Sequence, residues 1–130
     1  MRLSLLLAVL AALAFPAFAP ASPYLRAGIQ DDAWLQYGPG TLEQRLDRLD
    51  SLGVDVVRVT VNWRDTEPVR AGTDDWSRAD LLLDGLHEHG IAPLVTLWGT
   101  PGWANGHRAQ NWVPTSKSTF AALARRVAKR

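Results

Sequence analysis

The 130 residues include 14 basic and 13 acidic side chains, no cysteine and six tryptophans. This balance of charge excludes the basic surface of a nucleic-acid or anionic-surface binder. The absence of cysteine excludes a disulfide framework, so an exported domain of this sequence must rely on its hydrophobic core.

The first 21 residues have the features of a secretory signal peptide. Arg2 is a minimal positive region, residues 3–15 are almost all apolar or small, and small residues surround Ala19 and Ala21. The apolar run is too short for a comfortable membrane span. We therefore predict a signal peptide over residues 1–21 and a mature protein that is secreted or periplasmic, with no membrane contact after cleavage. Losing Arg2 leaves the mature chain with a net charge of zero.

The mature part alternates between strand and helix patterns. In chain order we predict a strand at 24–29, a turn-rich segment, a helix from Thr41 to Gly53, a strand at 54–61, a helix from Ser77 to Gly90, a strand at 91–98, a loop at 99–114 and a helix at 116–130. The first two helices begin with capping-box sequences and end at glycine. Strands alternating with helices favour a parallel α/β sheet.

The loops of this pattern differ in length in a consistent way. Helix-to-strand connections are one or two residues, whereas the strand-to-helix loop at 99–114 is long and has no predicted structure of its own. Long loops on this side of the sheet build the active sites of TIM barrels. A complete barrel takes about 250 residues. We therefore interpret residues 22–130 as the first three of eight βα units, an incomplete barrel from a truncated or partial gene product with open sheet edges.

The strand at 54–61 has an unusual polar face. The valines at 57, 59 and 61 share one face, while Arg58 and Asn62 lie on the other. Because a buried guanidinium without a partner is costly, we expect an acidic or solvated environment in front of Arg58. A half-exposed strand with its polar face in water fits the same pattern equally well.

Several segments of the sequence, taken together, match the pattern of a known group of enzymes. These segments are residues 52–59, 63, 66–68, 75–77, 90–95 and 100–104. Together they resemble the clan of retaining TIM-barrel glycoside hydrolases, which includes cellulases, β-xylosidases and β-galactosidases. The last segment is similar to the loop after strand three in cellulase-like and β-xylosidase-like members. The resemblance extends over residues 24–130.

The resemblance implies a chemistry that this chain does not carry alone. In that clan the acid/base glutamate follows strand four, usually after asparagine, and the nucleophile glutamate follows strand seven. Retention requires these carboxyl groups to lie about 5 Å apart. The present sequence has no Asn-Glu pair, so we predict no catalytic residue in it. By position, Arg58 corresponds to an arginine that keeps the nucleophile ionised.

We predict six substrate-binding residues, which are Arg58, Asn62, Trp63, Trp98, Trp103 and Asp32. Indole rings pack well on the C–H faces of pyranoses, although rim aromatics that pack on a neighbouring loop give the same pattern. For Asp32, capping or a solvated loop position is the commoner use.

Other prominent residues receive structural interpretations. Trp34, Trp76 and Trp112 are assigned to packing, because large aromatics mostly serve cores. Glu67, which precedes a proline, is assigned to fixing its loop through a hydrogen bond or an ion pair.

The sequence predicts no metal site and no cofactor. Residues 87–89, His-Glu-His, lack the spacing of a helical zinc motif and fit a polar helix end. There is no phosphate-binding glycine loop and no serine nucleophile elbow. These absences, together with the export signal, argue against a nucleotide-binding α/β domain.

The sequence thus predicts the N-terminal part of a secreted glycoside hydrolase that cleaves a polysaccharide or glycoside with retention of configuration. This part would supply a wall for the carbohydrate substrate and no chemistry of its own. The alternative is a non-catalytic carbohydrate-binding or surface protein that retains part of the barrel.

Overall fold

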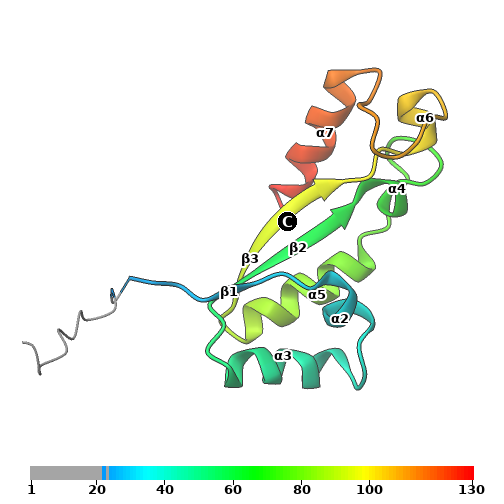
Figure 1. The fold of residues 1–130 in the computed structure, drawn as a ribbon. Helices are drawn as coiled ribbons and strands as arrows, with labels where there is room; N and C mark the ends of the chain where they lie inside the picture. Colours follow the sequence, from blue (N-terminus) through cyan, green and yellow to red (C-terminus); the bar gives the residue numbers. More distant parts are fainter. Residues whose placement is uncertain (1–21, 23) are drawn as a thin grey trace, which may run out of the picture.

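A computed structural model describes Ser22 and residues 24–130, which form a three-stranded parallel sheet with helices packed against it (Figure 1). The strands are β1 (Gly28–Ile29), β2 (Val56–Asn62) and β3 (Ala92–Trp98), in the order β1-β2-β3. β2 pairs with β3 over its whole length, from Val56 opposite Ala92 to Asn62 opposite Trp98. The predicted parallel α/β class is confirmed, and the sheet is consistent with part of a TIM barrel.

Helices connect and follow these strands. In the described residues they are α2 (Asp32–Tyr37), α3 (Leu42–Ser51), α4 (Trp63–Thr66), α5 (Ser77–Glu88), α6 (Gly102–Asn105) and α7 (Lys117–Val127). The three longer helices, α3, α5 and α7, correspond to the predicted helices. The short helices α2, α4 and α6 were not predicted, and α6 corrects the prediction that the loop at 99–114 has no structure of its own.

The first strand is shorter than predicted. Only Gly28 and Ile29 pair with β2, because β2 begins at Val56 and offers no strand alongside the residues before Gly28. The carbonyl of Ala27 still accepts hydrogen bonds from the amides of Asp55 and Val56, at 2.9 and 3.1 Å. Residues 24–27 are therefore exposed beside the sheet edge.

The helix ends follow the sequence signals, with one exception. Thr41 and Gln44 form the predicted capping box, each side chain accepting from the backbone of the other. Gly53 and Gly90 have φ values of 70° and 68°, which glycine adopts without strain, and they terminate α3 and α5. The second predicted capping box is wrong. Ser77 is already the first helical residue, and its amide and hydroxyl donate to Asp75 instead.

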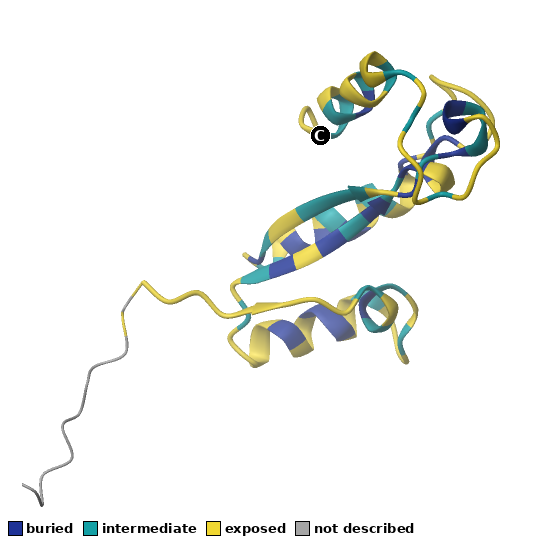
Figure 2. Ribbon diagram, turned by 45° about the horizontal axis from the view of Figure 1, so that its top comes forward, coloured by how far each residue is buried: buried dark blue, intermediate teal, exposed yellow. Residues whose placement is uncertain are grey.

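The hydrophobic core lies on the valine face of β2. Val57 and Val59 pack with leucines of α3 and α5 into one buried cluster. A second cluster, at the other end of the sheet, joins Val61 to Trp63, Trp76 and Leu123. Figure 2 shows the resulting alternation of buried and exposed residues along β2. Each buried aliphatic side chain contributes about 1.5–3 kcal/mol relative to an exposed one.

The opposite face of the sheet is open. Arg58 is exposed, and on β3 Leu94 and Trp98 are 57% and 45% exposed. In a closed barrel this face would be filled by inward-pointing side chains from other strands. No helix in the described part of the chain is long and apolar enough to cross a membrane. The predicted signal peptide, residues 1–21, lies outside the described residues.

The contact of α3 with α5 depends on Gly85. A Cβ atom at Gly85 would lie 2.6 Å from Leu46 Cδ1, so alanine must displace a fully buried leucine. We expect Gly85→Ala to cost about 1–3 kcal/mol through overpacking, less up to about 1 kcal/mol from the better helix propensity of alanine.

Urea unfolding followed by circular dichroism would measure this effect. In a Leu46→Ala background the obstacle is gone, so Gly85→Ala should become neutral or stabilising. An equal loss of stability in both backgrounds would show that the close approach of the two helices is not the cause.

Candidate functional site

The carboxyl ends of β2 and β3 bring the loops of the chain together at one end of the sheet (Figure 1). β2 runs directly into α4, and β3 runs into the loop that contains α6. The amide of Arg64 donates to the carbonyl of Gly99 at 2.7 Å, which joins the two strand ends. In parallel α/β folds this end of the sheet carries the ligand sites.

Asn62 fixes the turn at the end of β2. Its side-chain oxygen accepts from the amide of Arg64 at 3.2 Å and caps α4. The same oxygen would lie 2.1 Å from a Cβ atom at Gly99, whose φ is 77°. Any other residue at Gly99 would therefore clash with Asn62 in a strained backbone conformation. Asn62 was predicted to bind substrate, and its oxygen is engaged in this turn.

Glu67 is the buried centre of the loop after β2. Its carboxylate is fully buried and accepts from the indole N–H of Trp63 at 2.6 Å, from the amide of Gly72 at 2.9 Å and from the guanidinium of Arg126. Its backbone carbonyl accepts from the indole N–H of Trp103 at 2.7 Å. The interpretation that Glu67 fixes its loop is confirmed.

Arg126 extends this network to α7. Its Nε donates to Asp74 at 2.7 Å, and Asp74 also accepts from the indole N–H of Trp76 at 3.0 Å. Burial alone would raise the pKa of Asp74, but its hydrogen bonds and the charge of Arg126 outweigh burial and lower it. One guanidinium therefore holds two carboxylates from the same loop.

Trp63 and Trp103 form an edge-to-face pair, with centroids 5.6 Å apart and planes at 89°. Trp63 is only 1% exposed and also packs against Phe120. Trp103 is half-buried, with its N–H bound to Glu67. Both were predicted to contact sugar. The structure places Trp63 at the base of the hollow described next, where almost all of its surface is covered by neighbouring side chains.

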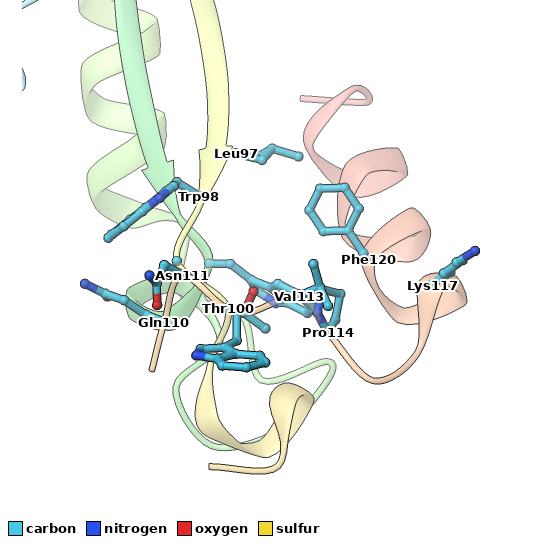
Figure 3. Close-up of a pocket in the computed structure, with 12 residues that line it drawn as sticks. Leu97, Trp98, Thr100, Gln110, Asn111, Val113, Pro114, Lys117 and Phe120 are labelled. Carbon is cyan, nitrogen blue, oxygen red and sulfur yellow. The ribbon is translucent and has the colours of Figure 1, made fainter. Parts of the chain in front are cut away.

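A hollow of about 500 Å³ lies between the end of β3, the following loop and α7 (Figure 3). Trp98 and Phe120 lie on opposite sides of it in this view, and Gln110 and Asn111 add amide groups. Trp112 also lines the hollow and is 51% exposed. Apolar surface with a few polar groups is typical of ligand pockets.

Trp112 corrects the sequence interpretation, which assigned it to packing. The long loop returns along β3 through a hydrogen bond from the amide of Thr100 to the carbonyl of Gln110, 2.8 Å long, and so brings Trp112 to the strand end. The guanidinium of Arg108 lies 4.7 Å from the centre of its ring. The sequence feature that could have identified Trp112 as a residue of the hollow was its position in a long loop after a parallel strand.

A second hollow of about 610 Å³ lies between α2, the end of β2 and the start of α5. Asp32 lines it, and each of its two oxygens accepts one hydrogen bond, from the amide and from the hydroxyl of Thr60, both at 2.8 Å. Asp31 caps α2 by accepting from the amide of Trp34 at 2.9 Å. The predicted substrate residue Asp32 therefore ties the first loop to β2.

Arg58 lies deeper on the open face of the sheet. Its Nε donates to the hydroxyl of Thr96 and its Nη1 to the side chain of Gln30, both at 2.9 Å. Within the described residues no carboxylate lies within ion-pair distance of Arg58. The guanidinium is thus held in place by neutral groups and faces solvent, as the sequence led us to expect.

No protein-family model and no curated protein matches the sequence. Solved structures do match it. Over 81% of this chain and 22% of the other, it superposes on the exo-β-1,4-mannosidase Op5Man5 from Opitutaceae bacterium strain TAV5, with 28% identity and a TM-score of 0.58. The chain is thus similar to part of a glycoside hydrolase with a TIM-barrel-like fold. The likeness covers only about a fifth of the length of such an enzyme.

A family 39 glycoside hydrolase from the gut symbiont Bacteroides cellulosilyticus WH2 shows the same fold. It matches 79% of this chain and 21% of its own length, with 20% identity and a TM-score of 0.57. The hollow beside Trp98 lies at the carboxyl end of β3, the end of the sheet at which TIM barrels carry their active sites.

We expect Glu67→Gln to destabilise the chain by about 3 kcal/mol, because it leaves Arg126 without its buried anion and places an amide N–H against other donors. Urea unfolding would measure the loss, and the near-ultraviolet circular dichroism of the Trp63–Trp103 pair should weaken with it. Glu88→Gln, at an exposed helix end, is the matched control. A Glu67→Gln variant as stable as this control would contradict the role assigned to the carboxylate.

Proposed function

We propose that this chain is the N-terminal, sugar-binding part of a secreted glycoside hydrolase, comprising the first three of eight βα units. The hollow lined by Trp98 and Trp112 at the carboxyl end of β3 carries the proposal. The likeness to a β-1,4-mannosidase supports it. The apolar segment over residues 1–21 supports export as a signal peptide.

The chemistry of the hollow suits a pyranose. An indole face packs on the C–H face of a sugar ring, while amide groups bind the hydroxyls at its edge. Trp98 and Trp112 are each about half exposed, so their rings remain accessible. The side-chain oxygen of Gln110 is buried and accepts no hydrogen bond from the described residues.

Arg58 has a separate role in this proposal. In the complete enzyme it faces the nucleophilic carboxylate, which a later strand supplies. An adjacent guanidinium stabilises the charged form of a carboxylate and so keeps the nucleophile ionised. The contacts with Thr96 and Gln30 hold the guanidinium in position before that partner arrives.

The reaction proposed for the complete enzyme is hydrolysis with retention of configuration. A protonated carboxyl group protonates the leaving oxygen while a second carboxylate attacks the anomeric carbon, and water then releases the sugar from the glycosyl-enzyme. This chain supplies neither carboxyl group. Its contribution is to bind the sugar ring and to position Arg58.

We expect Trp98→Ala and Trp112→Ala each to weaken binding of β-1,4-linked mannan, xylan or glucan by about tenfold, because each removes a stacking platform worth roughly 1.4 kcal/mol. Affinity electrophoresis through gels containing each soluble polysaccharide would measure this. Tyr24→Ala, which removes an exposed aromatic outside the hollow, is the control and should migrate like the wild type. Equal retardation of all four proteins would contradict the assignment of the site.

A second test concerns chemistry. We expect the chain alone to show no turnover of aryl glycosides, because it contains no acid/base and nucleophile pair. Clear turnover that survives purification would contradict the proposed division of roles.

The reading frame beyond Arg130 distinguishes an enzyme from a non-catalytic carbohydrate-binding protein. Continuation into a fourth strand followed by Asn-Glu supports the enzyme, whereas a stop codon supports a carbohydrate-binding protein.

A further inference from the structure

Three potential metal ligands meet on the helical side of the fold. Glu43 and Asp47 lie one turn apart on α3, and His89 follows the last residue of α5. His89 Nε2 lies 3.3 Å from an oxygen of Asp47 and 3.7 Å from an oxygen of Glu43. One ligand atom from each of the three residues lies within 4.8 Å of the others.

The imidazole of His89 is held in a fixed orientation. Its Nδ1 lies 2.8 Å from the carbonyl of Gly85, which can only accept, so Nδ1 carries the proton and the Nε2 lone pair points toward α3. The His89 side chain is 11% exposed, whereas those of Glu43 and Asp47 are 66% exposed. A histidine whose second nitrogen donates to a backbone carbonyl is the usual arrangement at metal sites.

The packing of the helices sets the distance between the ligands. Gly85 has no side chain and lets α5 approach Leu46 of α3 closely. Leu46 is fully buried and lies between Glu43 and Asp47 in the sequence. The same glycine therefore provides both the close approach and the carbonyl that orients His89.

We propose that Glu43, Asp47 and His89 form a binding site for a divalent first-row transition cation, with Zn²⁺ as the representative ion. Two ligands at bond lengths of 2.0–2.2 Å on a tetrahedral ion are about 3.4 Å apart, which the two observed nitrogen–oxygen distances bracket. Three protein ligands leave the fourth position to water. One imidazole with two carboxylates suits Zn²⁺ better than Ca²⁺ or Mg²⁺, which prefer oxygen ligands only.

The site is separate from the proposed sugar-binding hollow. His89 stands just before β3 begins, whereas the hollow lies where β3 ends. A bound ion would join α3 to α5 and stabilise the folded chain, because it binds the folded state preferentially. The sequence did not predict the site, since His89 is 42 residues from Asp47 and only the packing of α5 on α3 brings it to the two carboxylates.

Isothermal titration calorimetry of the full chain with ZnCl₂ tests the proposal. The hydrogen bond that His89 donates to the Gly85 carbonyl and the charges of Asp47 and Glu43 raise the pKa of His89 despite some burial, so a proton competes with the metal. The titration should therefore be done at pH 8, in a buffer that does not chelate zinc. We expect one Zn²⁺ per chain and a higher melting temperature with Zn²⁺ than with Ca²⁺ or Mg²⁺.

Substitutions then locate the ion. His89→Gln should weaken Zn²⁺ binding by more than about tenfold, the loss typical even for residues that only support metal ligands. The double substitution Glu43→Gln, Asp47→Asn should do the same, and it changes only exposed side chains, so it tests the site if His89→Gln fails to fold. His87→Gln removes an exposed histidine on the same helix and should bind like the wild type.

Two results would overturn the proposal. The first is no saturable binding of Zn²⁺ by the folded wild-type chain, in which case the three residues form an ion pair between helices and nothing more. The second is binding that His89→Gln and the double substitution leave unchanged while His87→Gln or a change at His107 abolishes it. Far-ultraviolet circular dichroism without metal would establish that each variant is folded.

Discussion

The position of the loops at the carboxyl end of the sheet depends on one buried carboxylate. Glu67 accepts hydrogen bonds from the indole of Trp63, the backbone amide of Gly72 and the guanidinium of Arg126. The first two are close to Glu67 in the sequence, whereas Arg126 is distant from it. A buried charge is tolerable only when it is paired and hydrogen-bonded, so all three donors offset the cost of burying the carboxylate. Because Arg126 belongs to α7, the loop after β2 and the last described helix are fixed to each other by the same group.

This constraint explains how a short chain presents an aromatic surface. Trp63 packs edge-on to Trp103, and both indole N–H groups donate to Glu67, one to the side chain and the other to the backbone. With these two rings used as support, Trp98 and Trp112 remain half-exposed beside the hollow. Trp63 and Trp103 act as supports because their indole N–H groups reach Glu67. The arrangement is consistent with binding sites that are held in shape before the ligand arrives.

Much of the fold could be predicted because it depends on local patterns. The valines of β2, the capping box at Thr41 and the glycines at 53 and 90 each act within a few residues, and all take the expected conformation. Contacts set by the course of a loop could not be predicted in this way. Trp112 reaches the strand end only because the loop folds back onto Thr100. The second capping box failed because Asp75, two residues earlier, accepts from Ser77 more directly.

The most direct measurement is a spectrum of the tryptophan indole N–H groups, recorded by nuclear magnetic resonance while a β-1,4-linked oligosaccharide is added. The six tryptophans should give six assignable signals. We expect the signals of Trp98 and Trp112 to move. That of Trp76 should stay, because this residue does not line the hollow and its N–H is bound to Asp74. An unchanged spectrum at saturating oligosaccharide, or the largest shift at Trp76, would contradict the proposed carbohydrate-binding surface.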